Sequence, residues 1–328
     1  MTRMDQEYRP GGASSPSREE ASGGFVTRDG ETWYRIANYD RMAPFFMTLV
    51  SGFDHWFFLS STGGLTCGRR DPDNALFPYT TDDKIHDADT TTGPQTHLRL
   101  HKGGGVTVWR PFARQFPALY IERNLYKNRV GNRLIFEEVH TGLDLVFSYA
   151  WSTSERYGFV RKAWLRNTGN EAVVVEVLDG LRNLLPWGVT QALQSVRSTL
   201  VDAYKQAEAC RDLPAAVYSL SSIPSDRAEP SEALKATVAW CTGLDRPELL
   251  LSETQVAAVG QGRPIQAERV SRGKRGAFFV HARVELEPGA AHEWYLAADV
   301  EQGPSRLPAL LAELKAGAGA EALEADIA

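Results

Sequence analysis

Positions 143–149 read Leu143-Asp144-Leu145-Val146-Phe147-Ser148-Tyr149, and the odd-numbered residues form one apolar face. Successive side chains of a β-strand point to opposite faces of the sheet, so this alternation predicts a strand with one buried face. The run Phe278–Leu286 repeats the pattern, with apolar residues at Phe278, Val280, Ala282, Val284 and Leu286. Both runs predict a protein built mainly from β-strands.

Turn residues lie on either side of the first run. His140-Thr141-Gly142 separates it from another apolar run that begins at Leu134, which predicts a hairpin over 134–149. Further along, Asn167-Thr168-Gly169-Asn170 joins Tyr157–Asn167 to Ala172–Leu178, and we expect these two runs to pair as a second hairpin. Roughly a dozen strands in succession predict a large antiparallel two-sheet sandwich.

Two segments have the period of a helix instead. Residues 190–210 predict a helical insertion, with one apolar face formed by Leu193, Val196, Leu200, Tyr204 and Ala207. Residues 305–325 are also helical in pattern, with Leu307, Leu310, Leu311 and Leu314. Residues 1–24 are rich in Gly, Ser, Pro and charge, which is typical of a disordered tail. We therefore expect a tail at 1–24, a sandwich domain at 25–303 and a helical segment at 304–328.

Composition narrows the classes of function. The 328 residues carry a net charge of −5, and a nucleic-acid-binding protein would show a basic excess. No run approaches the roughly 18 apolar residues of a membrane span, and the N-terminus lacks the apolar core of a signal peptide. The three cysteines form no CxxC pair, which argues against disulfides and structural zinc. We expect a cytoplasmic protein that binds neither nucleic acid nor membrane.

Residues 53–87 hold the densest mixture of polar and aromatic side chains. Flat aromatic rings stack on the C–H faces of sugars, while carboxylate, amide and guanidinium groups bond the sugar hydroxyls. The mixture predicts a carbohydrate site or an interdomain contact, although a long loop with its own hydrogen bonds has the same composition. With two tryptophans from other segments, the candidate residues are Trp56, Arg69, Arg70, Asp73, Asn74, Tyr79, Asp82, Trp109 and Trp187.

Other chemical signals are weaker. A metal could be bound by Asp82, Asp83, His86 and Asp87, but a solvated loop looks the same, and we expect no metal. Glu137 and Glu138 are a carboxylate pair of the kind that glycoside hydrolysis needs, but neighbours on a strand point to opposite faces. The sequence has no GxSxG motif and no P-loop. We therefore assign no catalytic residue and expect no cofactor.

Several stretches resemble the N-terminal region of bacterial proteins related to cellobiose phosphorylase, a group that includes the phosphorylase portion of cyclic β-glucan synthases. They cover most of residues 33–315. The first group comprises Tyr39–Met47, Ser60–Asn74 (SSTGGLTCGRRDPDN) and Phe77–Asp83 (FPYTTDD). The others are Trp164–Gly169 leading into Glu176–Pro186, and Trp294–Gln302 (WYLAADVEQ).

The resemblance implies a β-supersandwich of the galactose-mutarotase type. In the family, a helical linker and an (α/α)6 barrel follow it, and the barrel holds the general acid and the phosphate-binding residues. This chain is then expected to be a noncatalytic, carbohydrate-binding sandwich that supports the barrel of an inverting glycoside phosphorylase, glycosyltransferase or hydrolase. The implied partners are a β-glucoside oligosaccharide, phosphate bound by the parent enzyme, the barrel itself and a second copy of the chain.

Two alternatives remain. An aldose 1-epimerase on the same type of fold needs a histidine and a carboxylate that face each other across a sugar ring. His140 with Glu138, and His281 with Glu285, are such pairs, each on one strand face. The other alternative is a purely structural or oligomerisation module, whose exposed apolar surface would bind another chain.

Overall fold

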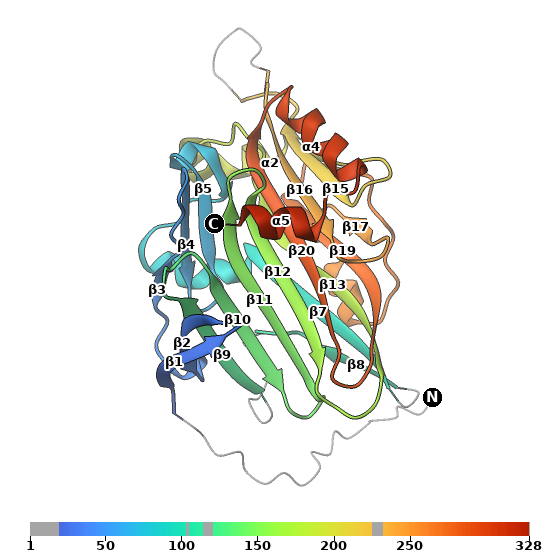
Figure 1. Ribbon diagram of the computed structural model, residues 1–328. Helices are drawn as coiled ribbons and strands as arrows, with labels where there is room; N and C mark the ends of the chain where they lie inside the picture. Colours follow the sequence, from blue (N-terminus) through green and yellow to red (C-terminus); the bar gives the residue numbers. More distant parts are fainter. Residues whose placement is uncertain (1–19, 103–104, 114–120, 225–231, 328) are drawn as a thin grey trace, which may run out of the picture.

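The computed structural model describes residues 20–102, 105–113, 121–224 and 232–327. The strands of this part of the chain pair antiparallel throughout and form three sheets (Figure 1). The largest has eleven strands in the order β1 (Ser22–Arg28), β2 (Glu31–Ala37), β9 (Ile121–Asn128), β10 (Leu134–His140), β11 (Leu145–Ser154), β12 (Gly158–Asn167), β20 (Ala291–Gln302), β16 (Ala236–Thr242), β15 (Ala215–Leu220), β14 (Lys205–Ala209) and β18 (Val270–Arg272).

The other two sheets are smaller. The five-stranded sheet has the order β17 (Glu248–Leu250), β19 (Gly276–Leu286), β13 (Val173–Leu184), β7 (Gly93–Lys102) and β8 (Gly105–Trp109). The four-stranded sheet consists of β3 (Phe46–Thr48), β4 (His55–Ser60), β5 (Leu65–Arg69) and β6 (Ala75–Phe77). Short 3₁₀ helices connect some of these strands: η1 (Tyr39–Arg41), η2 (Pro72–Asn74) and η3 (Asp82–Thr90).

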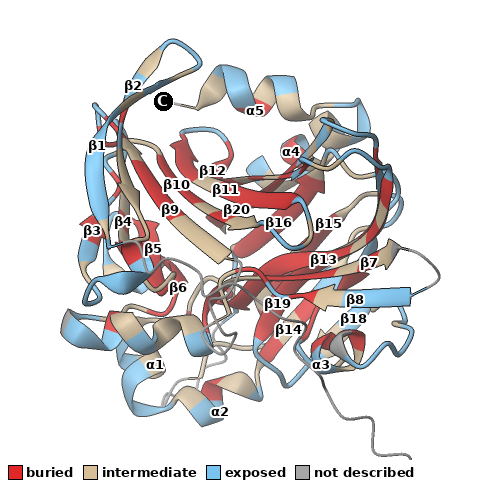
Figure 2. Ribbon diagram, turned by 90° about the horizontal axis from the view of Figure 1, so that it is seen from below, coloured by how far each residue is buried: buried red, intermediate tan, exposed pale blue. Residues whose placement is uncertain are grey.

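The two larger sheets pack face to face around one apolar core. Figure 2 shows β11, β12 and β20 on one side and β7, β13 and β19 on the other, with buried residues along both groups of strands. Phe147 and Trp294 from the first sheet and Val177 and Val280 from the second belong to the same cluster. This arrangement confirms the predicted mainly β, antiparallel two-sheet sandwich. The four-stranded sheet joins the same core through Phe57, whose ring lies 5.2 Å from that of Trp151.

The hairpin expected over 134–149 is present. β10 pairs with β11 in a register that places His140 opposite Leu145 and Phe136 opposite Tyr149. The rings of Phe136 and Tyr149 stack with their centroids 5.0 Å apart. Cross-strand aromatic pairs of this kind stabilise a sheet beyond the area that they bury.

The second expected hairpin is wrong. β12 pairs with β11 and β20, whereas β13 pairs with β7 and β19 in the opposite sheet. Asn167 does make a turn, since its side-chain amide donates to the carbonyls of Glu171 and Leu286. The turn carries the chain from one sheet to the other, because turn residues specify a reversal of direction and not the strand that will be the partner.

The helical insertion is shorter than expected. Helices α1 (Gln191–Val196) and α2 (Ser198–Asp202) are present, but Lys205–Ala209 forms strand β14 and pairs with β15. Ala207 lies in the main core, so burial in the sheet overrides the local helical pattern. At the other end of the chain, residues 22–24 of the expected tail belong to β1, and residues 1–19 lie outside the described residues.

The chain ends on the outer face of the eleven-stranded sheet. Helices α3 (Val256–Gly260), α4 (Arg306–Lys315) and α5 (Ala320–Asp326) complete the described elements. Leu310 of α4 and Leu323 of α5 pack with Val160 and Trp240 in a second apolar cluster (Figure 1). No described helix combines the length and the apolarity that a membrane crossing requires.

Candidate functional site

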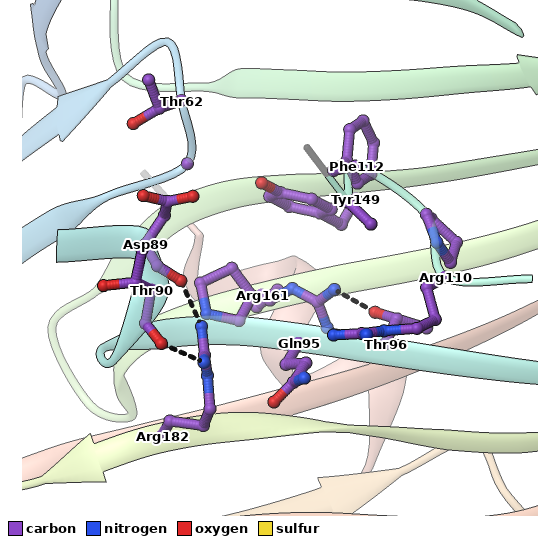
Figure 3. Close-up of a pocket in the computed structure, with 14 residues that line it drawn as sticks. Thr62, Asp89, Thr90, Gln95, Thr96, Arg110, Phe112, Tyr149, Arg161 and Arg182 are labelled. Carbon is purple, nitrogen blue, oxygen red and sulfur yellow. Dashed lines mark hydrogen bonds between the residues drawn. The ribbon is translucent and has the colours of Figure 1, made fainter. Parts of the chain in front are cut away.

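Two adjoining pockets lie at one end of the sandwich. The first, which we call the arginine pocket, has a volume of about 460 Å³ and is lined from both large sheets (Figure 3). Tyr149 and Arg161 come from the eleven-stranded sheet, and Gln95, Thr96 and Arg182 come from the five-stranded sheet. Arg110 and Phe112 follow β8 and complete the polar and aromatic lining.

The second pocket, which we call the acidic pocket, has the same volume of about 460 Å³. Its charged and polar lining includes Tyr39, Asp40, His86, Asp87 and Arg123. Thr62 and Phe112 line both pockets, so the two cavities share a wall.

A buried polar network forms the floor of the arginine pocket. Arg161 Nη1 lies 2.6 Å from Asp179 Oδ2, and both side chains are fully buried. Asp179 also accepts hydrogen bonds from Thr96 Oγ1 at 2.6 Å and from Trp294 Nε1 at 2.7 Å. Because the charge of Arg161 is paired and its position is fixed, this network holds the pocket open rather than competing for a ligand.

Tyr149 is held by the same network. The Arg161 guanidinium carbon lies 4.4 Å from the centroid of the Tyr149 ring, a cation–π contact. Burial raises the pKa of Tyr149, so its hydroxyl stays protonated at neutral pH. Phe136 stacks on the ring and Arg161 lies over it, so the side chain offers its hydroxyl group to the pocket rather than an aromatic face.

Arg182 reaches the pocket from the end of β13. Its two Nη atoms donate to the backbone carbonyls of Asp89 at 2.5 Å and Thr90 at 3.0 Å (Figure 3). Its side chain is only 7% exposed, and burial lowers its pKa from the ordinary value. Arg182 Nε is buried without a hydrogen-bond partner in the part of the chain that the structure describes.

His97 lies behind the pocket wall. Its Nε2 is 3.0 Å from the Gln95 amide nitrogen, which donates to it. Burial, followed by the positive charges of Arg110 and Arg182, lowers the pKa of His97 to about 4. The imidazole is therefore neutral at physiological pH and accepts the Gln95 amide proton, which fixes the Gln95 side chain in the pocket wall.

The acidic pocket combines a histidine with two carboxylates. His86 Nδ1 lies 2.7 Å from Ser60 Oγ, and Thr62 Oγ1 donates to the His86 carbonyl at 2.8 Å. These contacts hold η3 against the turn between β4 and β5. Asp40, on η1, and Asp87, on η3, offer carboxylate oxygens that can accept hydrogen bonds from hydroxyl groups.

Of the nine residues selected from the sequence, the eight whose side chains the structure describes line neither pocket. Arg69 is buried, and it donates to Asp299 and Asp54 at 2.7 Å each, so it ties β5 to β20. Arg70 adopts a left-handed φ of 58° and pairs with Glu301. Asp82 begins η3, and its side chain lies outside the described residues.

Trp109 is a core residue rather than a surface platform. Its ring is 3% exposed, and its Nε1 donates to the buried carboxylate of Glu138 at 2.8 Å. The burial comes from the inner face of β8, which the sequence reasoning could not assign. Trp109 is therefore not accessible to a ligand in this structure.

Five of the nine residues gather around η2, and we call them the η2 cluster: Trp56, Asp73, Asn74, Tyr79 and Trp187. The rings of Trp56 and Tyr79 meet edge to face at 5.5 Å, and Trp187 Nε1 donates to Asn74 Oδ1 at 3.2 Å. Asp73 Oδ1 accepts from the backbone of Gln191 at the start of α1. The predicted residues thus lie together, but on their own surface and away from the lining of the pockets.

The histidine–carboxylate pairs of the epimerase alternative do not meet across a cavity. Glu138 is fully buried and accepts hydrogen bonds from Trp109, Phe112 and Arg123. His281 Nδ1 lies 3.2 Å from Glu248 Oε2, while Glu285 approaches Arg283. Among the described residues, no group of three side chains is arranged to hold a metal ion.

The sequence did contain a signal for the arginine pocket. Arg161 and Arg182 each follow small or apolar residues in a buried part of a strand, in Phe159-Val160-Arg161 and Gly180-Leu181-Arg182. A charged residue in a buried strand is rare unless it is paired or functional. Apolar alternation alone, however, does not show which charges meet across the two sheets.

Comparisons with known proteins concern the fold alone. No protein-family model matches the chain, and no curated protein matches its sequence. Its structure is similar to the GalM/aldose epimerase homologue of C. elegans, with a TM-score of 0.44 and 10% identity over 80% of this chain and 100% of that one. Aldose-epimerase-type proteins are thus among the structures that this fold resembles.

Two larger carbohydrate-active proteins are also similar in structure. A polysaccharide lyase gives a TM-score of 0.43 and 11% identity over 83% of this chain and 34% of that one. A bacterial glucoamylase complexed with acarbose gives a TM-score of 0.36 and 10% identity, over 83% of this chain and 36% of that one. This chain spans about a third of the length of either protein. At these identities and TM-scores, the likeness says nothing about what this chain binds.

Proposed function

We propose that this chain is a carbohydrate-binding sandwich of a carbohydrate-active protein and that the arginine pocket and the acidic pocket form its sugar site. The observation that carries the proposal is the convergence of amide, hydroxyl, guanidinium and carboxylate groups around the half-buried ring of Phe112, which lines both pockets. Sugar sites need this combination, because the rings cover C–H faces while the polar groups bond hydroxyls.

The dimensions of the site agree with an oligosaccharide. Each pocket has a volume of about 460 Å³, within the range of roughly 300–1,000 Å³ for small-molecule sites. The shared wall at Thr62 and Phe112 places the two cavities side by side. A β-glucoside of two or more units can therefore occupy both pockets, with Phe112 between neighbouring sugar rings.

The chemistry of bond cleavage is proposed to lie outside this chain. In this proposal, a catalytic barrel of an inverting glycoside phosphorylase or hydrolase supplies the general acid and the phosphate site. The η2 cluster is the contact surface for that partner, because its half-buried aromatic rings lie beside polar groups with defined hydrogen bonds. Interdomain contacts within one protein are commonly of this mixed polar and aromatic kind.

Calorimetric titration with cellotetraose tests the sugar site. We expect wild-type protein to bind cellotetraose, and Gln95→Ala to bind it at least about tenfold more weakly, because the variant loses an amide from the pocket lining. Gln206→Ala is the matched control, since Gln206 on β14 donates to Ser219 on β15 and lines neither pocket. Absence of heat with wild type, or equal losses in the two variants, would contradict the proposal.

One observation favours a second candidate, an aldose 1-epimerase. Asp40, His86 and Asp87 face one cavity, which is the combination of histidine and carboxylates that ring opening by acid and base needs. Polarimetry of freshly dissolved glucose measures this activity directly. Acceleration of mutarotation by the wild-type protein that is abolished in His86→Asn would establish the epimerase activity. If mutarotation is not accelerated, the epimerase candidate is rejected and carbohydrate binding is the function that is left.

A further inference from the structure

We propose that the arginine pocket contains a subsite for an anionic group carried by the sugar, a carboxylate or a phosphate, with Arg110 and Arg182 as its binding residues. The inference deepens the proposed function and rests on it, because it names the chemical class of sugar that the pocket selects. It is carried by the charge, the burial and the unused hydrogen-bond donors of the pocket.

The positive charges of the pocket are only partly compensated. Arg161 is paired with Asp179 at 2.6 Å and is neutralised. Arg182 bonds two backbone carbonyls and forms no ion pair with any described carboxylate. The acidic groups that act on the pKa of Arg182 are Glu253 and Asp89. For Arg110, the described part of the chain contains no ion-pair partner and no hydrogen-bond acceptor within reach.

Burial makes this arrangement costly for Arg182 without a ligand. A buried guanidinium that bonds only neutral carbonyls retains most of its desolvation cost, because a neutral acceptor compensates a charge incompletely. Arg182 is only 7% exposed, and among the described residues its Nε has no hydrogen-bond partner. An anion at the pocket would supply the missing charge and an acceptor for this donor.

The geometry of the guanidinium also suits an oxyanion. Carboxylate and phosphate groups present paired oxygens that match the fork of guanidinium N–H donors, and such charge-assisted bonds are stronger than bonds between neutral groups. Gln95, Thr96 and Tyr149 line the same pocket and are neutral. Thr96 already bonds Asp179, so the Gln95 amide and the Tyr149 hydroxyl are the neutral groups that would bond hydroxyl groups of the sugar.

His97 provides an internal reporter of the bound charge. Its pKa is lowered to about 4 by burial and by the charges of Arg110 and Arg182, and its Nδ1 is buried without a partner in the described residues. An anion between the two arginines would offset their charge. The pKa of His97 is then expected to rise toward 6.5 when the subsite is filled.

The test uses glucose, glucuronic acid and glucose 6-phosphate, which differ only at carbon 6, with inorganic phosphate as a fourth probe. Calorimetry on the full chain is expected to show that glucuronic acid or glucose 6-phosphate binds at least about tenfold more tightly than glucose. The tighter of the two identifies the anion as carboxylate or phosphate. Added salt should weaken the binding of the anionic sugar and leave the binding of glucose unchanged, because salt screens the interaction between charges.

Variants locate the subsite. Arg110→Gln, at an exposed position, should remove most of the preference for the anionic sugar without loss of folding, and Arg182→Lys should reduce it. Arg246→Gln is the matched control, because Arg246 is 94% exposed and lines neither pocket. Proton NMR titration of His97 with and without the anionic sugar gives a second readout that does not depend on affinity.

The outcomes separate this inference from the proposed function. If glucose, glucuronic acid and glucose 6-phosphate bind with equal affinity, and Arg110→Gln does not change these affinities, the anionic subsite is overturned and the sugar site stays in place. Binding of inorganic phosphate alone, lost in Arg110→Gln, would retain an anion site and overturn the carbohydrate function. No binding of any of the four probes and no shift of the His97 pKa would overturn the anionic subsite, and the titration with cellotetraose decides the proposed function separately.

Discussion

Arg161 on β12 and Asp179 on β13 form an ion pair of 2.6 Å that bridges the two large sheets, and both side chains are fully buried. Thr96 on β7 and Trp294 on β20 bond the same carboxylate, so four strands from both sheets meet at Asp179. The pair fixes the distance between the sheets at the floor of the arginine pocket. A stability experiment at this pair therefore tests the architecture that forms the site.

Asp179→Asn is expected to destabilise the protein by about 3–5 kcal/mol, because it leaves the buried Arg161 charge without its counter-charge. Urea denaturation followed by circular dichroism measures the free energy of unfolding. Asp245→Asn is the control, since Asp245 is 95% exposed beside Arg246 and its loss should have no measurable effect. A similar effect of the two substitutions would contradict the role of the buried pair.

Stability is expected to fall as the pH is lowered from 6.5 to 5, in part through His97. The pKa of His97 is about 4 in the folded protein and 6.5 in an unfolded chain, so only the unfolded chain gains a proton in this range. Protonation then favours unfolding by about 2 kcal/mol at pH 5. Urea unfolding of wild type and His97→Asn at both pH values measures the contribution. An identical pH dependence of the two proteins would show that His97 does not titrate in this way.

Gly180→Ala should destabilise the sandwich by roughly 1–3 kcal/mol. A Cβ atom at position 180 would overlap the Phe278 carbonyl and the Phe279 ring on the neighbouring strand β19. Gly24→Ala, on β1, is the control because a Cβ there meets nothing within 4 Å. Thermal unfolding of both variants provides the comparison, and an unchanged midpoint for Gly180→Ala would refute the close approach of β13 and β19.

Two of the three tryptophans named from the sequence as candidate contact residues, Trp109 and Trp187, should affect stability differently. Trp109→Phe removes the donor to the buried Glu138 carboxylate, and we expect a loss of about 1–3 kcal/mol in the free energy of unfolding. Trp187→Phe removes a 3.2 Å hydrogen bond to Asn74 at a partly exposed site, and it should lower the free energy of unfolding by less than Trp109→Phe does. If Trp187→Phe destabilised the protein more than Trp109→Phe, the assignment of Trp109 to the core would be wrong.

The architecture was largely predictable because burial on one face leaves a period of two in the sequence. Alternation at Phe278–Leu286 predicted β19, and the turn His140-Thr141-Gly142 predicted the hairpin of β10 and β11. The turn after Asn167 misled the prediction, because β12 and β13 belong to different sheets and local residues carry no information about their distant partners β20, β7 and β19.

The candidate site was much less predictable. Sequence reasoning favoured the dense polar segment 53–87, and four of its residues do cluster around η2, together with Trp187. The pockets instead depend on residues that are far apart in the chain, such as Gln95, Tyr149 and Arg182. Their convergence results from the packing of one sheet on another, which no local motif encodes.

Hydrogen–deuterium exchange with and without cellotetraose tests the location of the sugar site most directly. We predict that the sugar slows exchange of backbone amides in segments 61–64, 89–96 and 110–113, which line the two pockets. Protection confined to segments 71–79 and 185–191 around the η2 cluster, or no protection anywhere, would contradict the account.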